Sequence, residues 1–291
     1  MKKLLFIFSF LIISWTPAPP SVDESPDYLT VATFNIAWLG DGNQDMFSRS
    51  GDDIYNIASV IRDCGAEIIA LQEIENERAL ERIMSFLPDW DFVISKNGSK
   101  QNLAFIFREY IKVTNAELNV KFQIDKTHSR PPFIANVKAG NFDFVLATLH
   151  FKATSRYDDT EKKVKQSYKI RKAQADLLND WAEDFLDSSQ ERDLIILGDF
   201  NDNPNNKRGL LNSLLDNKEI DFVTSDVPSC RNKNWKSIDH LLLSKSAQKR
   251  MLKNSERAYD FHFTFSKTES KRISDHCPVI ATFSLKAKDN D

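Results

Sequence analysis

The most constraining feature of this 291-residue chain is a short apolar run that ends abruptly in polar side chains. Residues 194–197 read Leu-Ile-Ile-Leu, and Gly198, Asp199, Phe200 and Asn201 follow directly. A continuous apolar run of this length, bounded by charged residues and a glycine, is typical of a strand that is buried on both faces. The polar residues then lie where the strand leaves the core. In layered α/β proteins, ligands bind at that edge of the sheet.

Other strand-like runs repeat the pattern. Three of them end in polar residues at the same kind of position: 29–34 before Asn35, 67–72 before Glu73, and 142–149 before His150. Two more begin with their polar residues: Asp239 and His240 before one run, Asp275 and His276 before the other. If these two strands run antiparallel to the others, all the polar residues meet at one edge. The sequence therefore predicts mixed sheets that share one polar mouth.

The first 20 residues are expected to be a secretory signal that does not belong to the fold. Lys2 and Lys3 give a positive start, residues 4–15 are apolar apart from two serines, and a proline-rich stretch follows. The apolar stretch is shorter than the roughly 20 residues that span a bilayer. We therefore predict a secreted or periplasmic protein without stable membrane association once the signal is removed. An uncleaved anchor is the alternative.

Composition and charge suit an ordinary soluble globular protein. The chain is 41% hydrophobic and 28% charged, and its net charge of −3 excludes a protein that coats nucleic acid with its whole surface. Because the predicted mouth draws on residues 35 to 276, we expect one domain over residues 21–291, and a monomer. Three cysteines cannot all pair, and Cys64 has the helical spacing of a core residue. We expect no disulfide framework, with a Cys230–Cys277 bridge as the alternative.

The residues expected at the mouth share a chemistry of carboxylate, amide and imidazole groups without thiolates: Asn35, Glu73, His150, Asp199, Asn201, Asp239, Asp275 and His276. Such donors suit Mg²⁺, Mn²⁺ or Ca²⁺ better than zinc. A divalent cation, a carboxylate that activates water and an imidazole that protonates a leaving group are what phosphodiester hydrolysis requires. The sequence contains no nucleophile elbow, glycine-rich phosphate loop or HExxH motif that would indicate another chemistry.

Six segments, spread over residues 28–285, carry a family resemblance: TFNIAW, LQEIEN, TLHFKAT, GDFND, IDHLLL and SDHCPV. In this order they resemble the endonuclease/exonuclease/phosphatase superfamily, and within it most nearly the deoxyribonuclease I-like secreted nucleases. We accordingly expect an α/β (α+β) four-layer sandwich, in which two packed mixed β-sheets are flanked by outer helices. Candidate helices are residues 52–64, 76–87 and 160–187. The resemblance implies an Mg²⁺-dependent endonuclease that hydrolyses DNA, with RNA as an alternative substrate and Mn²⁺ or Ca²⁺ as alternative cations.

The resemblance also implies roles for the acidic and amide residues. Glu73 is expected to be the principal metal ligand, with Asn35 helping to hold the metal and Asp275 belonging to its shell. Asp199 is expected to orient and deprotonate the attacking water. Asn201 is expected to fix the phosphate.

The histidines and basic residues complete the expected site. His276 would contact a non-bridging oxygen of the transition state, Asp239 would orient a catalytic histidine, and His150 would be the acid for the 3′ leaving oxygen. Phosphate contacts are expected from three basic residues: Arg130, by resemblance, and Lys152 and Arg156, which follow His150 closely.

Two departures from the subgroup leave the substrate open. Gln101 stands where the subgroup has a glutamate that supports the equivalent of His150, and Glu75 stands where pancreatic-type enzymes place an arginine in the minor groove. Duplex DNA is thus less well supported than the reaction type. The alternatives are a sphingomyelinase-like or inositol-phosphate phosphatase enzyme on the same scaffold, and an inactive binding module. The intact set of candidate residues argues against the last of these.

Overall fold

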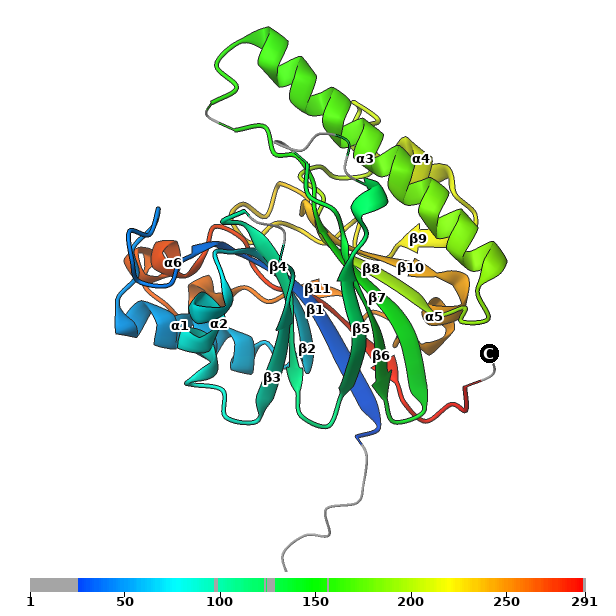
Figure 1. Cartoon of the computed structure of the whole chain (residues 1–291), viewed down its shortest axis with the longest axis horizontal. Coiled ribbons are helices and arrows are strands. Elements are labelled where there is room, and N and C mark those ends of the chain that lie inside the picture. The colour runs from blue at the N-terminus through cyan, green and yellow to red at the C-terminus, as the bar shows by residue number, and fades with distance from the viewer. Residues whose placement is uncertain (1–25, 97–98, 123, 125–128, 156, 290–291) are drawn as a thin grey trace, which may run out of the picture.

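The computed structural model describes residues 26–96, 99–122, 124, 129–155 and 157–289. The predicted signal at 1–20 and the candidate Arg156 lie outside this range. Two six-stranded mixed sheets pack face to face, with helices on their outer sides (Figure 1). The expected four-layer sandwich is therefore confirmed.

The first sheet has the order β11-β12-β1-β2-β4-β3. Its strands are β1 (Tyr28–Leu39), β2 (Ile68–Ile74), β3 (Trp90–Ile94), β4 (Asn102–Arg108), β11 (Arg257–Ala258) and β12 (Val279–Ser284). At its centre β1 and β2 are parallel, whereas β12 runs antiparallel to β1. The start of β12 therefore lies at the same edge as the ends of β1 and β2.

The second sheet repeats this plan with the order β5-β6-β7-β8-β10-β9. Its strands are β5 (Lys112–Leu118), β6 (Phe133–Ala139), β7 (Phe142–His150), β8 (Leu194–Asp199), β9 (Ile220–Phe222) and β10 (Asp239–Ser244). Here β7 and β8 are parallel, and β10 runs antiparallel to β8. Both reversed strands thus have the orientation that the sequence predicts. Every residue of β8 is buried, as its apolar run indicates.

Aromatic and aliphatic side chains fill the space between the sheets. Phe105 of β4 and Phe133 of β6 stack across this core, with ring centroids 5.3 Å apart. One polar contact also crosses it: Gln72 of β2 donates from Nε2 to Thr33 Oγ1 at 3.0 Å and to Thr148 Oγ1 of β7 at 3.1 Å. Since a buried amide is costly to leave unpaired, this contact favours one relative position of the two packed sheets below the polar mouth.

The helices cover the outer faces of the sheets: α1 (Gly51–Asp63), α2 (Glu77–Met84) and α6 (Lys267–Ile273) beside the first, and α3 (Glu161–Ser188), α4 (Asn212–Asp216) and α5 (Lys245–Arg250) beside the second (Figure 1). Two short 3₁₀ turns are η1 (Val120–Phe122) and η2 (Phe261–Phe263). The three predicted helices form within a few residues of their expected bounds. Within the described residues, no helix combines the length and the apolar character needed to cross a bilayer.

The cysteines only partly follow the expectation. Cys64 is free and buried, as its spacing predicts. Cys230 and Cys277, however, form a disulfide with an S–S distance of 2.08 Å, so the expectation of no disulfide framework is wrong and the alternative holds. The reason is tertiary: the loop before β10 folds back beside the start of β12, which brings Cα atoms 47 residues apart to 6.2 Å.

Candidate active site

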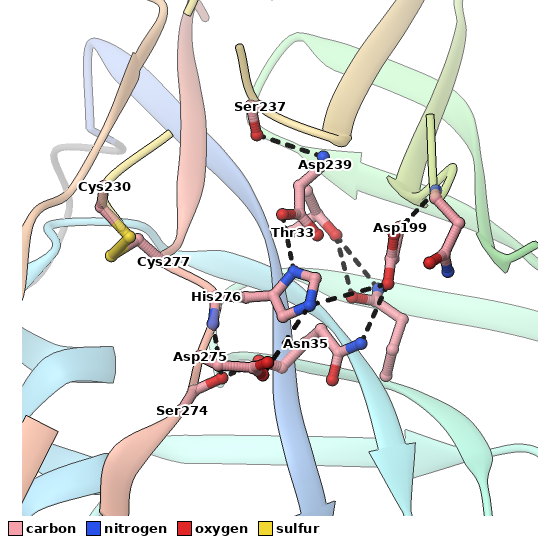
Figure 2. Close-up of polar contacts among 12 residues, drawn as sticks. Thr33, Asn35, Asp199, Cys230, Ser237, Asp239, Ser274, Asp275, His276 and Cys277 are labelled. Atoms are coloured by element: carbon pink, nitrogen blue, oxygen red, sulfur yellow. Dashed lines mark hydrogen bonds and ion pairs between the residues drawn. A yellow bond between two sulfur atoms is a disulfide. The ribbon is translucent and has the colours of Figure 1, made fainter. Parts of the chain in front are cut away.

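The predicted mouth exists, at the edge where the central strands of both sheets end. Asn35 and Glu73 come from the first sheet, and His150, Asp199 and Asp239 from the second. His150 and Asp239 lie opposite Asp199 in the strand register, one on each side. His276 comes from the segment before β12, and its ring points toward Asp239 and Asp199 (Figure 2).

Asn35 joins the two sheets at this edge. Its Nδ2 donates to Glu73 Oε1 at 3.2 Å and to Asp199 Oδ2 at 3.1 Å. Its Oδ1 accepts the backbone N–H of Ala37 at 2.9 Å, which fixes the orientation of the amide. One amide group therefore holds a carboxylate of each sheet beside the other.

Unusual backbone conformations gather at the mouth. Four non-glycine residues have positive φ there: Ala37 (52°), Trp38 (62°), Glu73 (66°) and Asn201 (53°). Such conformations each cost about 1–3 kcal/mol and persist where the surrounding structure demands them. One demand is visible, because the backbone N–H of Trp38 donates to Glu73 Oε2 at 3.1 Å. The strain thus aims the Glu73 carboxylate.

Gly198 sets the spacing of the two strands that carry His150 and Asp199. Its φ is 149°, and a Cβ at this position would lie 2.1 Å from the carbonyl oxygen of Leu149. Only glycine fits such a close approach of two backbones. The glycine of the GDFN segment therefore brings the histidine at the end of β7 level with the aspartate at the end of β8.

His276 is held as an imidazolium. Its Nδ1 donates to Asp239 Oδ2 at 2.8 Å, and its Nε2 lies 3.9 Å from Asp199 Oδ2 (Figure 2). Burial lowers the pKa of the ring, but Asp239 and Asp199 outweigh it and place the pKa well above its usual value. The Ser274 hydroxyl accepts the His276 backbone N–H at 3.0 Å and donates to the Asn35 carbonyl at 2.7 Å, which fixes the segment.

His150 is in the opposite state. Its side chain is buried, and its Nε2 lies 3.7 Å from Glu73 Oε1 and 3.6 Å from Asp199 Oδ2. Burial, with the positive charges of Arg130 and His276, lowers its pKa well below the usual value, so the ring is neutral at pH 7. Within the described residues His150 Nδ1 has no hydrogen-bond partner, so Gln101 does not support the ring at that atom.

The carboxylates of the mouth fit a cation. Burial raises the pKa of both Asp199 and Glu73, and Asp239 Oδ1 is buried without a hydrogen-bond partner among the described residues. Single ligand atoms of Asp199, Asp239 and His276 lie within 4.8 Å of one another. Buried carboxylate oxygens, with no thiolate beside them, suit a hard divalent cation.

The candidate phosphate-binding residues Arg130 and Lys152 differ in whether they face the mouth. Arg130 is half-buried, and burial lowers the pKa of its guanidinium. The negative charges of Glu73 and Asp199 act in the opposite direction, so the guanidinium lies near the mouth. Lys152 Nζ instead donates to the Ala153 carbonyl at 2.7 Å and lies 3.8 Å from an oxygen of Asp158. In this structure the Lys152 ammonium is therefore engaged with its own loop.

The remaining two candidates lie at the border of the cluster. Asn201 donates its backbone N–H to Asp199 Oδ1 at 2.8 Å and its Nδ2 to the Phe151 carbonyl at 3.1 Å, so it orients Asp199. Asp275 is exposed, with Oδ1 3.8 Å from His276 Nε2 and Oδ2 3.2 Å from Arg231 Nη1.

Sequence reasoning missed several residues that orient the site. Ser237 accepts the backbone N–H of Asp239 at 3.1 Å, as Ser274 does for His276. The signal was present, since a serine stands two positions before each functional residue and such serines commonly form this turn. On α3, Arg171 donates to the Lys152 carbonyl at 2.9 Å, and Gln174 accepts the backbone N–H of Lys152 at 2.8 Å. The basic sequence of this helix does not predict these contacts.

Comparison with solved structures shows the same fold in three similar proteins. An endonuclease/exonuclease/phosphatase from Bacteroides vulgatus has a TM-score of 0.61 at 14% identity, covering 89% of this chain and 99% of the other. Truncated Caenorhabditis elegans TDP2 gives 0.63 at 15%, with coverages of 88% and 98%. A mannosyl-6-phosphatase from Bacteroides thetaiotaomicron gives 0.60 at 16%, with coverages of 87% and 98%. At these identities the likeness is one of fold alone.

The sequence itself settles the family. No curated protein sequence matches the chain significantly. Residues 32–276 do match the Endonuclease/Exonuclease/phosphatase family, a span that begins just before Asn35 and ends at His276. This span also contains Glu73, His150 and Asp199. The chain therefore belongs to the endonuclease/exonuclease/phosphatase family of metal-dependent phosphoesterases.

Proposed function

We propose that this chain is an exported, monomeric, Mg²⁺-dependent endonuclease of the deoxyribonuclease I-like type, which hydrolyses phosphodiester bonds of DNA. One observation carries the proposal: the His276 imidazolium, held by Asp239, faces the buried Asp199 carboxylate, which Asn35 ties to Glu73. Export and a single catalytic domain over residues 21–291 rest on the character of the N-terminal segment and on the spread of the site along the chain.

The cation would be held by the oxygens of Glu73, Asn35 and Asp275. When bound, it supplies positive charge to the phosphate oxygens and to the leaving oxygen. Around it, Asn35 and the Asn201 backbone each hold one oxygen of Asp199. That leaves Asp199 oriented to accept a proton from water, and its raised pKa makes it a stronger base than a surface carboxylate.

The two histidines have different roles in the proposed reaction. His276, already protonated, donates a hydrogen bond to a non-bridging phosphate oxygen, and Asp239 keeps its Nε2–H directed into the mouth. His150 is neutral in the substrate-free protein. An anionic phosphate beside it raises its pKa and lets it carry the proton for the leaving oxygen. Arg130 neutralises the charge that the substrate brings.

A substrate panel tests the proposal. The mature protein is incubated with supercoiled plasmid, RNA, sphingomyelin, an inositol polyphosphate and a sugar phosphate, with Mg²⁺ or with EDTA. Glu73→Gln and His276→Asn remove the proposed groups, and Glu219→Gln is the matched control, because Glu219 is exposed and contributes no side-chain contact to the mouth.

Plasmid nicking that requires Mg²⁺ and both site residues, and that survives in the control, supports the proposal. RNA cleavage without nicking would change the substrate to RNA. Release of phosphate or phosphocholine without cleavage of either nucleic acid would replace the endonuclease with a phosphatase or a sphingomyelinase-like enzyme. Inactivity on the whole panel would favour a binding module.

A further inference from the structure

One border of the mouth is a loop that the mechanism above does not use. Residues 229–231 and 235–238, between β9 and β10, line a cavity of about 140 Å³ together with Asp239, Asp275 and His276. Trp235 lies on this wall and is 60% exposed. The other described tryptophans, Trp38, Trp90 and Trp181, are buried or half-buried. A large indole thus stands in solvent beside the proposed catalytic histidine.

The loop that carries Trp235 is held rigidly. The backbone N–H of Trp235 donates to the Asn232 carbonyl, and the Trp235 carbonyl accepts the backbone N–H of Ser229, both at 2.8 Å. Pro228 and Lys236 form an antiparallel bridge. The Cys230–Cys277 disulfide then ties the loop to the residue after His276 (Figure 2). Binding of a ligand to the indole would therefore cost little conformational entropy, because the loop is already ordered.

A second exposed aromatic side chain lies next to this loop. Phe263 is 86% exposed, the most of any large hydrophobic side chain in the described residues. Its turn, η2, is anchored by Phe261, which is fully buried. Lys233 of the loop places Nζ 5.9 Å from the centroid of the Phe263 ring, so Phe263 lies beside the loop that carries Trp235. We call Trp235 and Phe263 the aromatic wall.

Cations accompany the aromatic wall in replaceable contacts. Arg231, Lys233 and Lys236 each pair with a carboxylate, of Asp275, Asp260 and Asp226 respectively, and about half of each basic side chain is exposed. Asp275 and Asp226 are exposed as well, so the pairs of Arg231 and Lys236 contribute little and can exchange a carboxylate for a phosphate. Asp260 is only 11% exposed, so Lys233 is held more firmly. Aromatic faces interleaved with exposed cations suit a flexible polyanion that carries planar groups.

Another border of the mouth, beside Glu73, is acidic. Carboxylate oxygens of Asp41, Asp45 and Glu75 lie within 4.8 Å of one another. Glu75, two residues after Glu73, accepts the N–H of Asp41 at 3.2 Å and pairs with Lys100 at 2.7 Å. A duplex that spanned the mouth would bring a second phosphate backbone toward this acidic border. A single strand held on the aromatic wall would avoid it.

We propose that the aromatic wall stacks the unpaired bases of a single-stranded nucleic acid, so that single strands and not duplexes are the preferred substrate. This inference rests on the proposed phosphodiesterase function. Base stacking is tolerant of sequence because every base has an aromatic face. The rigid loop therefore fixes the strand beside His276 without selecting a particular base.

The test compares three substrates in Mg²⁺: a fluorescent single-stranded oligonucleotide, the same oligonucleotide in a duplex, and a small abasic diester of two sugar units, which has no aromatic group to stack. The variants are Trp235→Ala, Phe263→Ala and Trp235→Phe, which keeps an aromatic face. Tyr28→Ala is the matched control, since Tyr28 is 44% exposed at the opposite end of β1 from Asn35. Binding of the oligonucleotide in EDTA is followed by fluorescence anisotropy.

For the single strand we expect wild-type kcat/KM to exceed that for the duplex, and Trp235→Ala to lower it by roughly 5- to 150-fold, the range that loss of one stacked base gives. Phe263→Ala should lower it as well, Trp235→Phe should restore most of it, and affinity in EDTA should fall in parallel. Hydrolysis of the small diester should stay unchanged in every variant, as should all activities of Tyr28→Ala.

Equal or better cleavage of the duplex by wild type, or unchanged single-strand kinetics in both alanine variants, would overturn the inference and leave the phosphodiesterase standing. Failure of wild type to hydrolyse any of the three substrates would instead remove the proposed function on which the inference rests.

Discussion

The Cys230–Cys277 disulfide allows a quantitative prediction of stability. It closes a segment with a sequence separation of 47 residues. A cross-link over a loop of that length removes chain entropy from the unfolded state worth about 4 kcal/mol at 25 °C. The double variant Cys230→Ser with Cys277→Ser should therefore raise the unfolding equilibrium constant by about three orders of magnitude.

Urea unfolding followed by tryptophan fluorescence measures this change. With a slope of about 3 kcal/mol/M, a loss of about 4 kcal/mol lowers the midpoint by more than about 1 M. Dithiothreitol should lower the wild-type midpoint by the same amount and leave the double variant unaffected. Cys64→Ala is the control: the Cys64 thiol is free, so this variant should keep the full response to dithiothreitol.

If thiol titration shows that dithiothreitol has opened the bridge, yet the wild-type midpoint does not move, the bridge does not constrain the unfolded chain as argued. If the double variant matches wild type without reductant, the two cysteines are not paired in the folded protein.

Three further predictions concern the mouth and its surroundings. Asp239→Asn removes the negative charge that keeps His276 an imidazolium and should lower kcat by roughly 10²- to 10⁴-fold, with an unchanged circular dichroism spectrum. His240 is fully buried, and burial lowers its pKa to about 4. As the pH falls, the His240 ring therefore takes up a proton at a higher pH in the unfolded state than in the folded state. Between pH 7 and pH 5, wild type should therefore lose about 2 kcal/mol of stability relative to His240→Gln, measured by urea unfolding at each pH. Gly198→Ala places a methyl group against the Leu149 carbonyl and should destabilise the fold by about 3 kcal/mol or more in the same assay. Equal stability of Gly198→Ala and wild type would show that the two strands can separate without cost.

The strand plan was predictable because its signal is local. Apolar runs that stop at Glu73 and His150 mark the ends of β2 and β7, and a run that follows Asp239 marks the start of β10. The run that stops at Asn35 marks the polar edge, although β1 itself continues to Leu39. Burial on both faces requires such runs, and a shared polar edge requires the reversed strand to be antiparallel. Residue order along the chain was thus enough to place the mouth and the candidate residues around it.

The parts that could not be predicted are contacts between distant segments. The disulfide, the Arg231–Asp275 pair and the Gln72 bridge each depend on how loops and sheets lie in space, and no spacing along the chain encodes that. The positive φ of Glu73 is of the same kind. Glutamate has no preference for that conformation, which the fold imposes so that the carboxylate reaches the mouth.

Ionisation shows most clearly why residue type alone does not decide a role. His150 and His276 are the same residue at the same edge of the sandwich, yet the first is neutral and the second charged. The difference lies in their partners: Asp239 contacts only His276, at 2.8 Å, whereas Arg130 adds positive charge near His150. One histidine is thus ready to stabilise negative charge before substrate arrives, and the other gains its proton only when an anion is bound. If the proposed function is right, an arriving phosphodiester completes the site that hydrolyses it, which would link the recognition of a phosphate to the ability to cleave it.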